Sequence, residues 1–433
     1  MKSFQTILLI VFAFFIVGAV LIFSGVLGGG SGSQDKLIAQ PVIMWGTVSK
    51  STMEDILQKA IDAGDKFEIT YVEKRADSFE AELIDALASN KGPDLILAPH
   101  TLVLKQRDKL LPLPETAFSR RLFMDSFVEA GETLLGTDQE GGESIVLGLP
   151  LFLDPIVMYW NRDMFTKAGL SAPPSTWLEV QLLPERLTKL DERGNIVEGA
   201  VGLGGVNNVS HFKEILSAQI MQTGNKIVTF ALGRASVVLA EGTNAESALR
   251  FYSEFGNPSL PKYSWNSAKR SSLDEFIAGK LAIYFGFGSE LGIIEARNPH
   301  LNFDTANFPQ ISSGERRLTY ADVYTLAVIK NSSVQNAAYA VAYRMSLGVA
   351  ADIAGSELRL PPARRDLLSV ADEDPNVALF ESAAVISKTW FDPNWVVTRN
   401  IFADMIESVL IGKLSPSSAV SAASARIQDL LNI

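Results

Sequence analysis

The sequence contains no cysteine, few histidines and no strongly basic segment. Without cysteine there can be no disulfide framework, no Cys-ligated zinc site, no thiol nucleophile and no lipid-modified cysteine anchor. The three histidines, His100, His211 and His300, are scattered along the chain, and no HExxH zinc motif is present. Chemistry must therefore come from carboxylates, amides, hydroxyls and aromatic rings, and we expect neither a cofactor nor a bound metal.

The charge balance is acidic, with 38 Lys and Arg against 49 Asp and Glu and a formal net charge of −11. Both signs are mixed along the chain, and no basic stripe of the kind that phosphate binding requires is visible. We therefore exclude nucleic acid as a partner. A chain of 433 residues is long enough for two or three domains, each with its own core.

The N-terminal segment lacks charge altogether between Ser3 and Gln34, and residues 7–27 are almost wholly apolar. As a helix these residues would span about 31 Å, which matches the hydrocarbon core of a bilayer. Lys2 precedes the span, so we expect a single-pass anchor in the cell membrane with the remainder outside the cytoplasm. A signal peptide cleaved to release a secreted protein is the alternative, although its apolar region is usually only about 7–15 residues. The Gly/Ser-rich residues 28–34 would form a flexible tether.

The globular part begins near Asp35 with alternating strand and helix signals. Short apolar runs predict strands and amphipathic periods predict helices; the strands are 41–47, 67–72 and 94–98, and the helices are 50–63 and 78–89. This alternation is typical of a mostly parallel sheet, whose ligands lie beyond the carboxyl ends of the strands.

A second α/β stretch follows from about residue 156 to 306, and the chain ends in helices. The predicted elements are a hairpin over 187–202, helices at 207–223, 244–254 and 272–279, a strand at 281–285, an extended crossing at 303–309, a strand at 325–329, and helices at 334–347, 401–410 and 418–431.

The most informative window is 148–179, because its residue types follow a recognisable order. These are Gly148, Pro150, Tyr159, Asn161, Asp163, Phe165, Lys167, Ala168, Gly169, Leu170, Pro173, Pro174, Thr176, Trp177 and Glu179. The window resembles the extracellular solute-binding proteins of ABC importers, family 1, the maltose-binding-protein-like group. Trp160 stands where that family usually has a second tyrosine.

Weaker matches to the same family extend the resemblance from about residue 42 to 431. They are residues 91–94, 110–113 and 191–195, then Phe276, Gly279, Lys280, Ala282 and Gly286, and finally Gly412, Lys413, Ser415 and Ala419. Many members in Gram-positive bacteria carry an acylated cysteine, which is absent here. The predicted membrane helix would serve the same purpose.

The resemblance implies a hinged, two-lobed α/β fold, the type II periplasmic-binding-protein fold, after the N-terminal transmembrane helix. The lobes would comprise residues 35–152 with 308–360 and residues 153–307 with 361–433, joined by crossings near 150–155, 304–309 and 358–363. It also implies a monomeric binding protein, not an enzyme, that captures a carbohydrate, expected to be an oligosaccharide, and delivers it to the transmembrane subunits of an ABC permease.

The family recognises sugars with aromatic rings stacked on pyranose faces and with polar groups around the hydroxyl rim. Rings desolvate C–H surface, and ionised acceptors make the stronger hydrogen bonds. Our candidate ligand-binding residues are Trp45, Asp154, Tyr159, Trp265, Phe287, Tyr320, Asp322, Tyr324 and Trp395.

Each candidate also has a purely structural interpretation. Trp177 is expected to pack in the second lobe, and Trp160 to lie in its core. Asp154 could simply form a turn before Pro155. The acidic residues 372–374 indicate a solvated loop, with a calcium site as the alternative.

Other functions remain open at this stage. The same fold could bind a glycerol phosphodiester, a polyamine or ferric ion, and Tyr320, Asp322 and Tyr324 form the one tyrosine-rich acidic group that iron would need. A glycosidase would require two carboxylates at catalytic separation, which no motif specifies. A membrane-tethered sensor or adhesin without transport is a further alternative.

Overall fold

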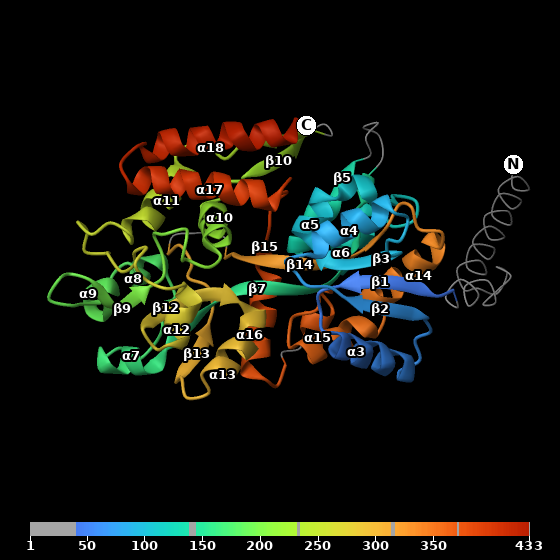
Figure 1. Cartoon of the computed structure of the whole chain (residues 1–433), viewed down its shortest axis with the longest axis horizontal. Coiled ribbons are helices and arrows are strands. Elements are labelled where there is room, and N and C mark those ends of the chain that lie inside the picture. Colours follow the sequence, from blue (N-terminus) through green and yellow to red (C-terminus); the bar gives the residue numbers. More distant parts are fainter. Residues whose placement is uncertain (1–39, 138–143, 232–233, 313–316, 370–371, 433) are drawn as a thin grey trace, which may run out of the picture.

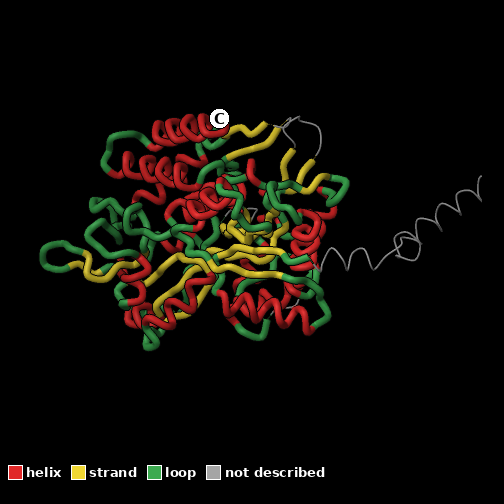
Figure 2. Tube along the Cα trace, turned by 45° about the vertical axis from the view of Figure 1, so that its right-hand side comes forward, coloured by secondary structure: helices red, strands yellow, loops and turns green. Residues whose placement is uncertain are grey.

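The apolar segments of the sequence form one long mixed β-sheet that runs through both halves of the molecule, with helices on its outer sides (Figures 1 and 2). This computed structural model describes residues 40–137, 144–231, 234–312, 317–369 and 372–432. Along the main path the strand order is β2-β1-β3-β14-β7-β12-β9-β8, with β13 paired to β7 and β15 to β14.

The elements fall into two stretches separated by the long strand β7. The first comprises β1 (Val42–Gly46), α3 (Lys50–Asp62), β2 (Ile69–Glu73), α4 (Phe79–Ala88), β3 (Leu95–Pro99), α5 (His100–Lys105), the 3-10 helix η1 (Arg107–Lys109), β4 (Leu113–Pro114), α6 (Arg120–Ser126), the 3-10 helix η2 (Glu129–Leu134), β5 (Leu135–Thr137), β6 (Ser144–Val146) and β7 (Leu149–Asn161).

The second comprises α7 (Arg162–Lys167), α8 (Trp177–Val180), α9 (Pro184–Leu187), β8 (Lys189–Leu190), β9 (Ile196–Val201), α10 (Phe212–Gln222), β10 (Val228–Ala231), β11 (Arg234–Val237), α11 (Asn244–Glu254), α12 (Ser272–Ile277), β12 (Leu281–Phe287), the 3-10 helix η3 (Gly288–Glu290), α13 (Leu291–Arg297), β13 (Phe303–Ala306), β14 (Thr319–Val328), α14 (Gln335–Leu347), α15 (Ala350–Leu358), the 3-10 helix η4 (Leu367–Ser369), α16 (Pro375–Val385), β15 (Ser387–Lys388), α17 (Trp395–Leu410) and α18 (Pro416–Leu431).

The predicted parallel unit at the start of the chain is confirmed. β1 pairs in parallel with β2 and with β3, and α3 begins where the Ser49 hydroxyl accepts a hydrogen bond from the Thr52 N–H at 3.2 Å. Met53, Ile56 and Leu57 lie on the buried face of that helix. The 3.6-residue period of apolar residues in this segment therefore correctly predicts which face of α3 is buried.

The C-terminal part of the window 148–179, which carries the family resemblance, contains residues that start and bury the helix α8 (Trp177–Val180). Thr176 and Glu179 form a capping box that starts α8: the Glu179 N–H donates to the Thr176 hydroxyl at 3.2 Å, and the Thr176 N–H donates to the Glu179 carboxylate at 3.1 Å. Trp177 is buried and donates from Nε1 to the Gln222 side-chain oxygen at 2.7 Å. The prediction that Trp177 is a packing residue is confirmed.

Two separate hydrophobic cores lie along the sheet, one in each half of Figure 1. β7 passes from one to the other between Leu153 and Ile156, and β14 does so between Ala321 and Tyr320. Both strands thus cross the junction of the two cores, side by side and antiparallel.

The position of the second crossing differs from the expected 304–309. Phe308 and Leu318 both pack in the second core, and the change of core comes only at the start of β14. The third change also comes later than 358–363, because Ala363 and Leu368 still pack with the first core, whereas Leu379 packs with the second. Apolar runs show which segments are buried but not which core buries them.

No helix among the residues that the structure describes is both long enough and apolar enough to cross a membrane. The predicted transmembrane segment, residues 7–27, and the tether that follows it lie outside the described residues.

Candidate functional site

Two carboxylates face each other where the chain passes between the cores. Asp154 on β7 is the register partner of Asp322 on β14. Asp322 is flanked by Ala321 and Val323, which both pack in the first core, and Asp154 lies between Leu153 of the first core and Pro155 at the crossing. This acidic pair therefore forms part of the junction of the two halves.

Asp154 is buried, with 4% of its surface exposed, and its carboxylate accepts a hydrogen bond from the Ser289 N–H at 3.0 Å. Burial raises the pKa of Asp154 to about 6, and the charge of Glu290 adds a smaller rise. The hydrogen bonds from Ser289 lower the pKa but do not cancel the effect of burial. A fraction of this carboxyl is therefore protonated near neutral pH.

Asp322 keeps 24% of its side chain exposed and lies 3.7 Å from the Nδ1 atom of His100. Burial, together with the charges of Glu214 and Asp154, raises the pKa of Asp322 to about 8. His100 does not compensate this charge, because burial lowers the pKa of the imidazole to about 3 and keeps it neutral. Asp322 thus has no charged cation within ion-pair distance among the described residues, and the charges of His211 and Lys213 offset only part of the rise.

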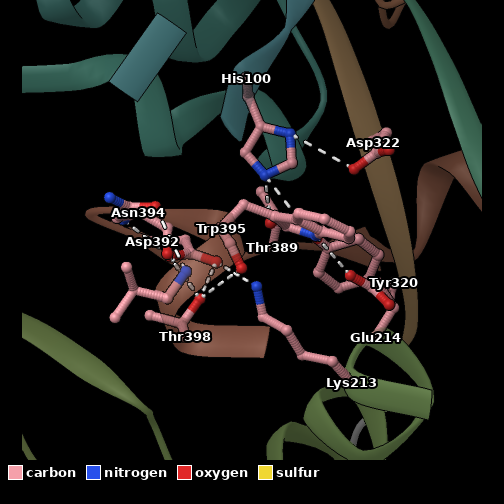
Figure 3. Close-up of polar contacts among 11 residues, drawn as sticks. His100, Lys213, Glu214, Tyr320, Asp322, Thr389, Asp392, Asn394, Trp395 and Thr398 are labelled. Atoms are coloured by element: carbon pink, nitrogen blue, oxygen red, sulfur yellow. Dashed lines mark hydrogen bonds and ion pairs between the residues drawn. The ribbon is translucent and has the colours of Figure 1, made fainter. Parts of the chain in front are cut away.

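His100, the first residue of α5, holds the junction together as a neutral ring (Figure 3). Its Nδ1 accepts the Val323 N–H at 3.2 Å, so the hydrogen belongs on Nε2. Nε2 lies 2.8 Å from the Thr389 hydroxyl and 3.4 Å from the Tyr320 hydroxyl. The ring therefore links α5, β14 and the segment before α17.

The N-terminal end of α10 brings further charges to the junction. Glu214 is 4% exposed and accepts a hydrogen bond from Nε1 of Trp395 at 2.8 Å. Its neighbour Lys213 forms a buried ion pair with Asp392 and lies 5.4 Å from the ring centroid of Trp395 (Figure 3). The ring centroid of Trp390 is 5.3 Å from the same ammonium group. Lys213 is therefore neutralised behind the Trp395 ring.

A second ion pair lies beside Phe287. His211 Nε2 is 3.2 Å from the Glu290 carboxylate, and the His211 ring packs edge-to-face on Phe287 with centroids 4.7 Å apart. Burial opposes the charged form of His211, but the charge and hydrogen bond of Glu290, together with the charges of Glu214 and Asp322, outweigh it and raise the histidine pKa. Glu290 also accepts the Tyr284 hydroxyl and the Phe287 N–H, each at 2.9 Å.

Several predicted site residues meet at this junction. Asp154, Asp322, Phe287, Tyr320 and Trp395 all belong to it through the contacts above. Their polar partners come from both halves of the molecule.

Two further candidates lie nearer the first core. Tyr324 stacks on Phe152 with centroids 4.5 Å apart. Trp45, at the carboxyl end of β1, is 9% exposed and lies beneath the Lys74 ammonium group, 3.8 Å from the ring centroid. No contact of Trp45 with the junction residues is found among the described residues, so its role at the rim stays a prediction.

Tyr159 and Trp265 do not join the site, contrary to our expectation from the sequence. Both are fully buried in the second core. The Tyr159 hydroxyl donates to the Phe287 carbonyl at 2.7 Å, and Trp265 Nε1 donates to the Asn208 side chain at 3.1 Å. Their polar atoms are thus satisfied within the core, and both residues act in packing.

Sequence reasoning missed His100, His211, Lys213 and Glu214. A usable signal was present, because a Lys-Glu pair at the start of an otherwise apolar helix must be neutralised when that helix is buried. Two of the three histidines of the chain also lie at this junction.

A cavity of about 490 Å³ adjoins the junction through Thr389, the residue that contacts His100. Its walls come from both halves: Glu129 and Leu135 from the first, and Met221 and Phe230 from the second. An ion pair between Lys388 and Glu129 links its two sides.

Comparison with known proteins decides the family. The family described as bacterial extracellular solute-binding protein matches residues 50–342. The chain belongs to this family. Its members are binding proteins rather than enzymes, and the two-lobed α/β fold is shared with solved relatives.

One such structure is the cyclic alpha-maltosyl-1,6-maltose binding protein from Arthrobacter globiformis, with a TM-score of 0.72 at 17% identity over 90% of this chain and 99% of that one. Another is a cyclo/maltodextrin-binding protein complexed with maltotetraose, with a TM-score of 0.69 at 16% identity over 90% and 96% of the two chains. In sequence, a protein of Brucella abortus (strain 2308) named as a binding protein is 22% identical over 308 residues, which is 69% of this chain and 71% of the relative.

Proposed function

We propose that this protein captures a carbohydrate, expected to be an oligosaccharide, in a cleft between its two lobes and delivers it to an ABC permease. The observation that carries the proposal is the junction of the two cores, where carboxylates and aromatic rings from both halves meet. Family membership and the sugar-binding proteins with the same fold support it.

The chemistry of the junction suits a sugar. Phe287 and Trp395 are partly exposed aromatic rings that could cover the apolar face of a pyranose. Asp154, Asp322 and Glu214 supply carboxyl groups that hydrogen-bond to hydroxyl groups, as acceptors when ionised and also as donors when protonated. An anionic solute such as a glycerol phosphodiester is the weaker alternative, because the junction gathers carboxyl groups and its cations Lys213 and His211 are already paired.

The lobes of this proposal follow the two cores, with β7 and β14 as hinge strands. A solute that touches Asp322 of the first half and Phe287 of the second makes its full set of contacts only when the lobes close. Binding would therefore shift the population towards the closed form by that difference in contact energy.

For its cellular context, we propose a monomer held at the cell membrane by residues 7–27, with the globular part outside the cytoplasm and within reach of the permease subunits. Secretion after cleavage of that segment is the alternative. Mass-spectrometric determination of the mature N-terminus in the native membrane fraction separates the two.

The test is ligand-linked stabilisation of the full-length protein in detergent, followed by thermal unfolding and tryptophan fluorescence. The panel contains mono- and oligosaccharides together with glycerol phosphodiesters, polyamines and ferric salts. A ligand that binds the folded state at a hundredfold excess over its Kd adds about 2.7 kcal/mol of stability.

A response to one class of glycan alone supports the proposal. A response to one of the other solutes overturns the sugar assignment and keeps the binding role. Silence across the panel would favour a tethered sensor or adhesin.

A further inference from the structure

The Phe287 ring is carried by a turn whose backbone is firmly held. The Phe287 N–H donates to the Glu290 carboxylate at 2.9 Å, and the Phe287 carbonyl accepts the Tyr159 hydroxyl at 2.7 Å. A Cβ atom on Gly286 would collide with the Glu290 carboxylate, which therefore lies directly against the backbone of the turn. These contacts fix the backbone of Phe287, whereas the torsion angles of its partly exposed side chain depend on what the ring touches.

His211 is a neighbour that touches this ring. The imidazole packs edge-to-face on Phe287 with centroids 4.7 Å apart. Its Nε2 atom lies 3.2 Å from both oxygens of the Glu290 carboxylate. One carboxylate thus holds both the backbone of Phe287 and the imidazole that packs on the Phe287 ring.

The backbone of His211 has a conformation that is unusual for its position. Among the described residues, three residues other than glycine have a left-handed φ. Asn90 and Arg359 have it at the C-terminal ends of α4 and α15, where this conformation commonly ends a helix. His211 instead precedes the first residue of α10, with φ 56° and ψ 25°. A residue with a side chain keeps this costly conformation only where its surroundings enforce it.

Hydrogen bonds on both sides of His211 enforce this conformation. The Ser210 N–H donates to the Ser272 hydroxyl at 2.9 Å, and the His211 carbonyl accepts the Ile215 N–H at 2.9 Å. With its backbone held in this way, the imidazole is fixed between the Glu290 carboxylate and the Phe287 ring.

We propose that His211 is a positioning residue for solute binding, because it holds the Phe287 ring in the orientation that stacks on a pyranose. This inference rests on the proposed function, since Phe287 serves as a stacking ring only if the solute is a sugar. A ring that is already oriented loses less conformational freedom on binding than a freely rotating one, so the solute binds more tightly. His211 then acts on affinity through Phe287 and not through a contact of its own.

A double-mutant cycle on the Kd of the full-length protein in detergent tests this inference, because residues that act through each other have non-additive effects. The probes are maltotriose, cellotriose, mannotriose and raffinose. The one that binds the parent most tightly is titrated into each variant by isothermal titration calorimetry. His211→Asn removes the imidazole, and asparagine tolerates the left-handed backbone. We expect Kd to rise about fivefold in His211→Asn, about tenfold in Phe287→Ala and again about tenfold in the double variant.

His300→Asn is the matched control, because it makes the same substitution at an exposed turn before β13. It should leave Kd unchanged both in the parent and in Phe287→Ala. If His211→Asn does not fold, His211→Gly takes its place in the cycle, because glycine adopts the left-handed backbone without steric cost.

The outcomes separate this inference from the proposed function. A rise of about fiftyfold in the double variant, the product of the two single effects, would show that His211 acts independently of Phe287. That result, or an unchanged Kd in the His211 variant or in Phe287→Ala, overturns the inference while the sugar-binding function stands. If none of the probes binds the parent, the proposed function fails and this inference fails with it.

Discussion

At the scale of single residues, Asp322 shows how far tertiary surroundings change a side chain. The sequence places an ordinary aspartate in an apolar strand, whereas the fold sets it opposite Asp154, near Glu214 and against a neutral His100. The carboxyl consequently holds its proton to a pH of about 8. The charge of the Asp322 carboxyl therefore depends on neighbours that only the folded structure brings close to it.

This predicts a pH-dependent effect of Asp322→Asn on stability. The folded protein binds more protons at this position than the unfolded chain, so the unfolding free energy contributed here falls as pH rises from about 4 to about 8. Asparagine removes that loss. The advantage of the variant over the parent should grow by about 4 kcal/mol between pH 4.5 and pH 8, since each unit between the unfolded and the folded pKa is worth about 1.36 kcal/mol.

Denaturant titrations of parent and variant across this pH range measure the difference. A constant offset at all pH values would show that the carboxyl titrates normally.

Phe287 provides a second test at this scale. Its ring is partly exposed between the second core and the junction. Phe287→Ala should weaken the binding of the glycan found by the stabilisation assay by about tenfold, or about 1.4 kcal/mol. Tyr343→Ala is the matched control, because that ring is 48% exposed on α14 and contacts Phe118, away from the junction. Equal losses in both variants would contradict a specific role for Phe287.

At the scale of elements, helices with a clear apolar face were predicted well, and residues 244–254 form α11 as expected. The start of α10 was placed at 207 but lies at Phe212, after His211 adopts a left-handed φ of 56°. β14 begins at Thr319, well before the predicted 325, because its first half combines polar side chains with burial. Sequence periods identify elements more reliably than their ends.

The entry to β7 illustrates why one small residue matters to an element. A Cβ atom on Gly148 would lie 2.6 Å from Thr325 Cγ2 and 2.7 Å from the Leu326 carbonyl oxygen of β14. Gly148→Ala should therefore lower the unfolding free energy by about 1–3 kcal/mol.

The same substitution at Gly292 is the control. No atom lies within 4 Å of a Cβ built there, in the helix α13, so alanine should be neutral or add about 0.5–1 kcal/mol. Chemical denaturation of both variants measures the contrast. Similar effects at the two glycines would exclude close strand packing as the cause.

At the scale of the whole molecule, the two cores and the strands that connect them predict a change in lobe separation on binding. The chain has no cysteine, so two introduced cysteines can carry spin labels without background. Ala88 on α4 and Ser421 on α18 are exposed positions in opposite halves (Figure 1).

Pulsed electron–electron double resonance measures the distance between the two spin labels. In the doubly labelled full-length protein it should show a second population of distances at saturating glycan. A pair within one half, Ala88 with Gln58 on α3, serves as the control and should not change. An unchanged distribution for the interlobe pair would show that binding does not move the lobes.

The sequence by itself determined the class of protein, the parallel unit at its start and most helices, because apolar periodicity and family-like motifs are local properties. It also indicated Asp154, Asp322, Phe287 and Trp395. The tertiary structure decided that Tyr159 and Trp265 belong to a core and that Lys213 and His211 are already paired. It also brought three carboxylates together from distant segments. Burial and pairing depend on neighbours that are remote in sequence, and no local pattern records them.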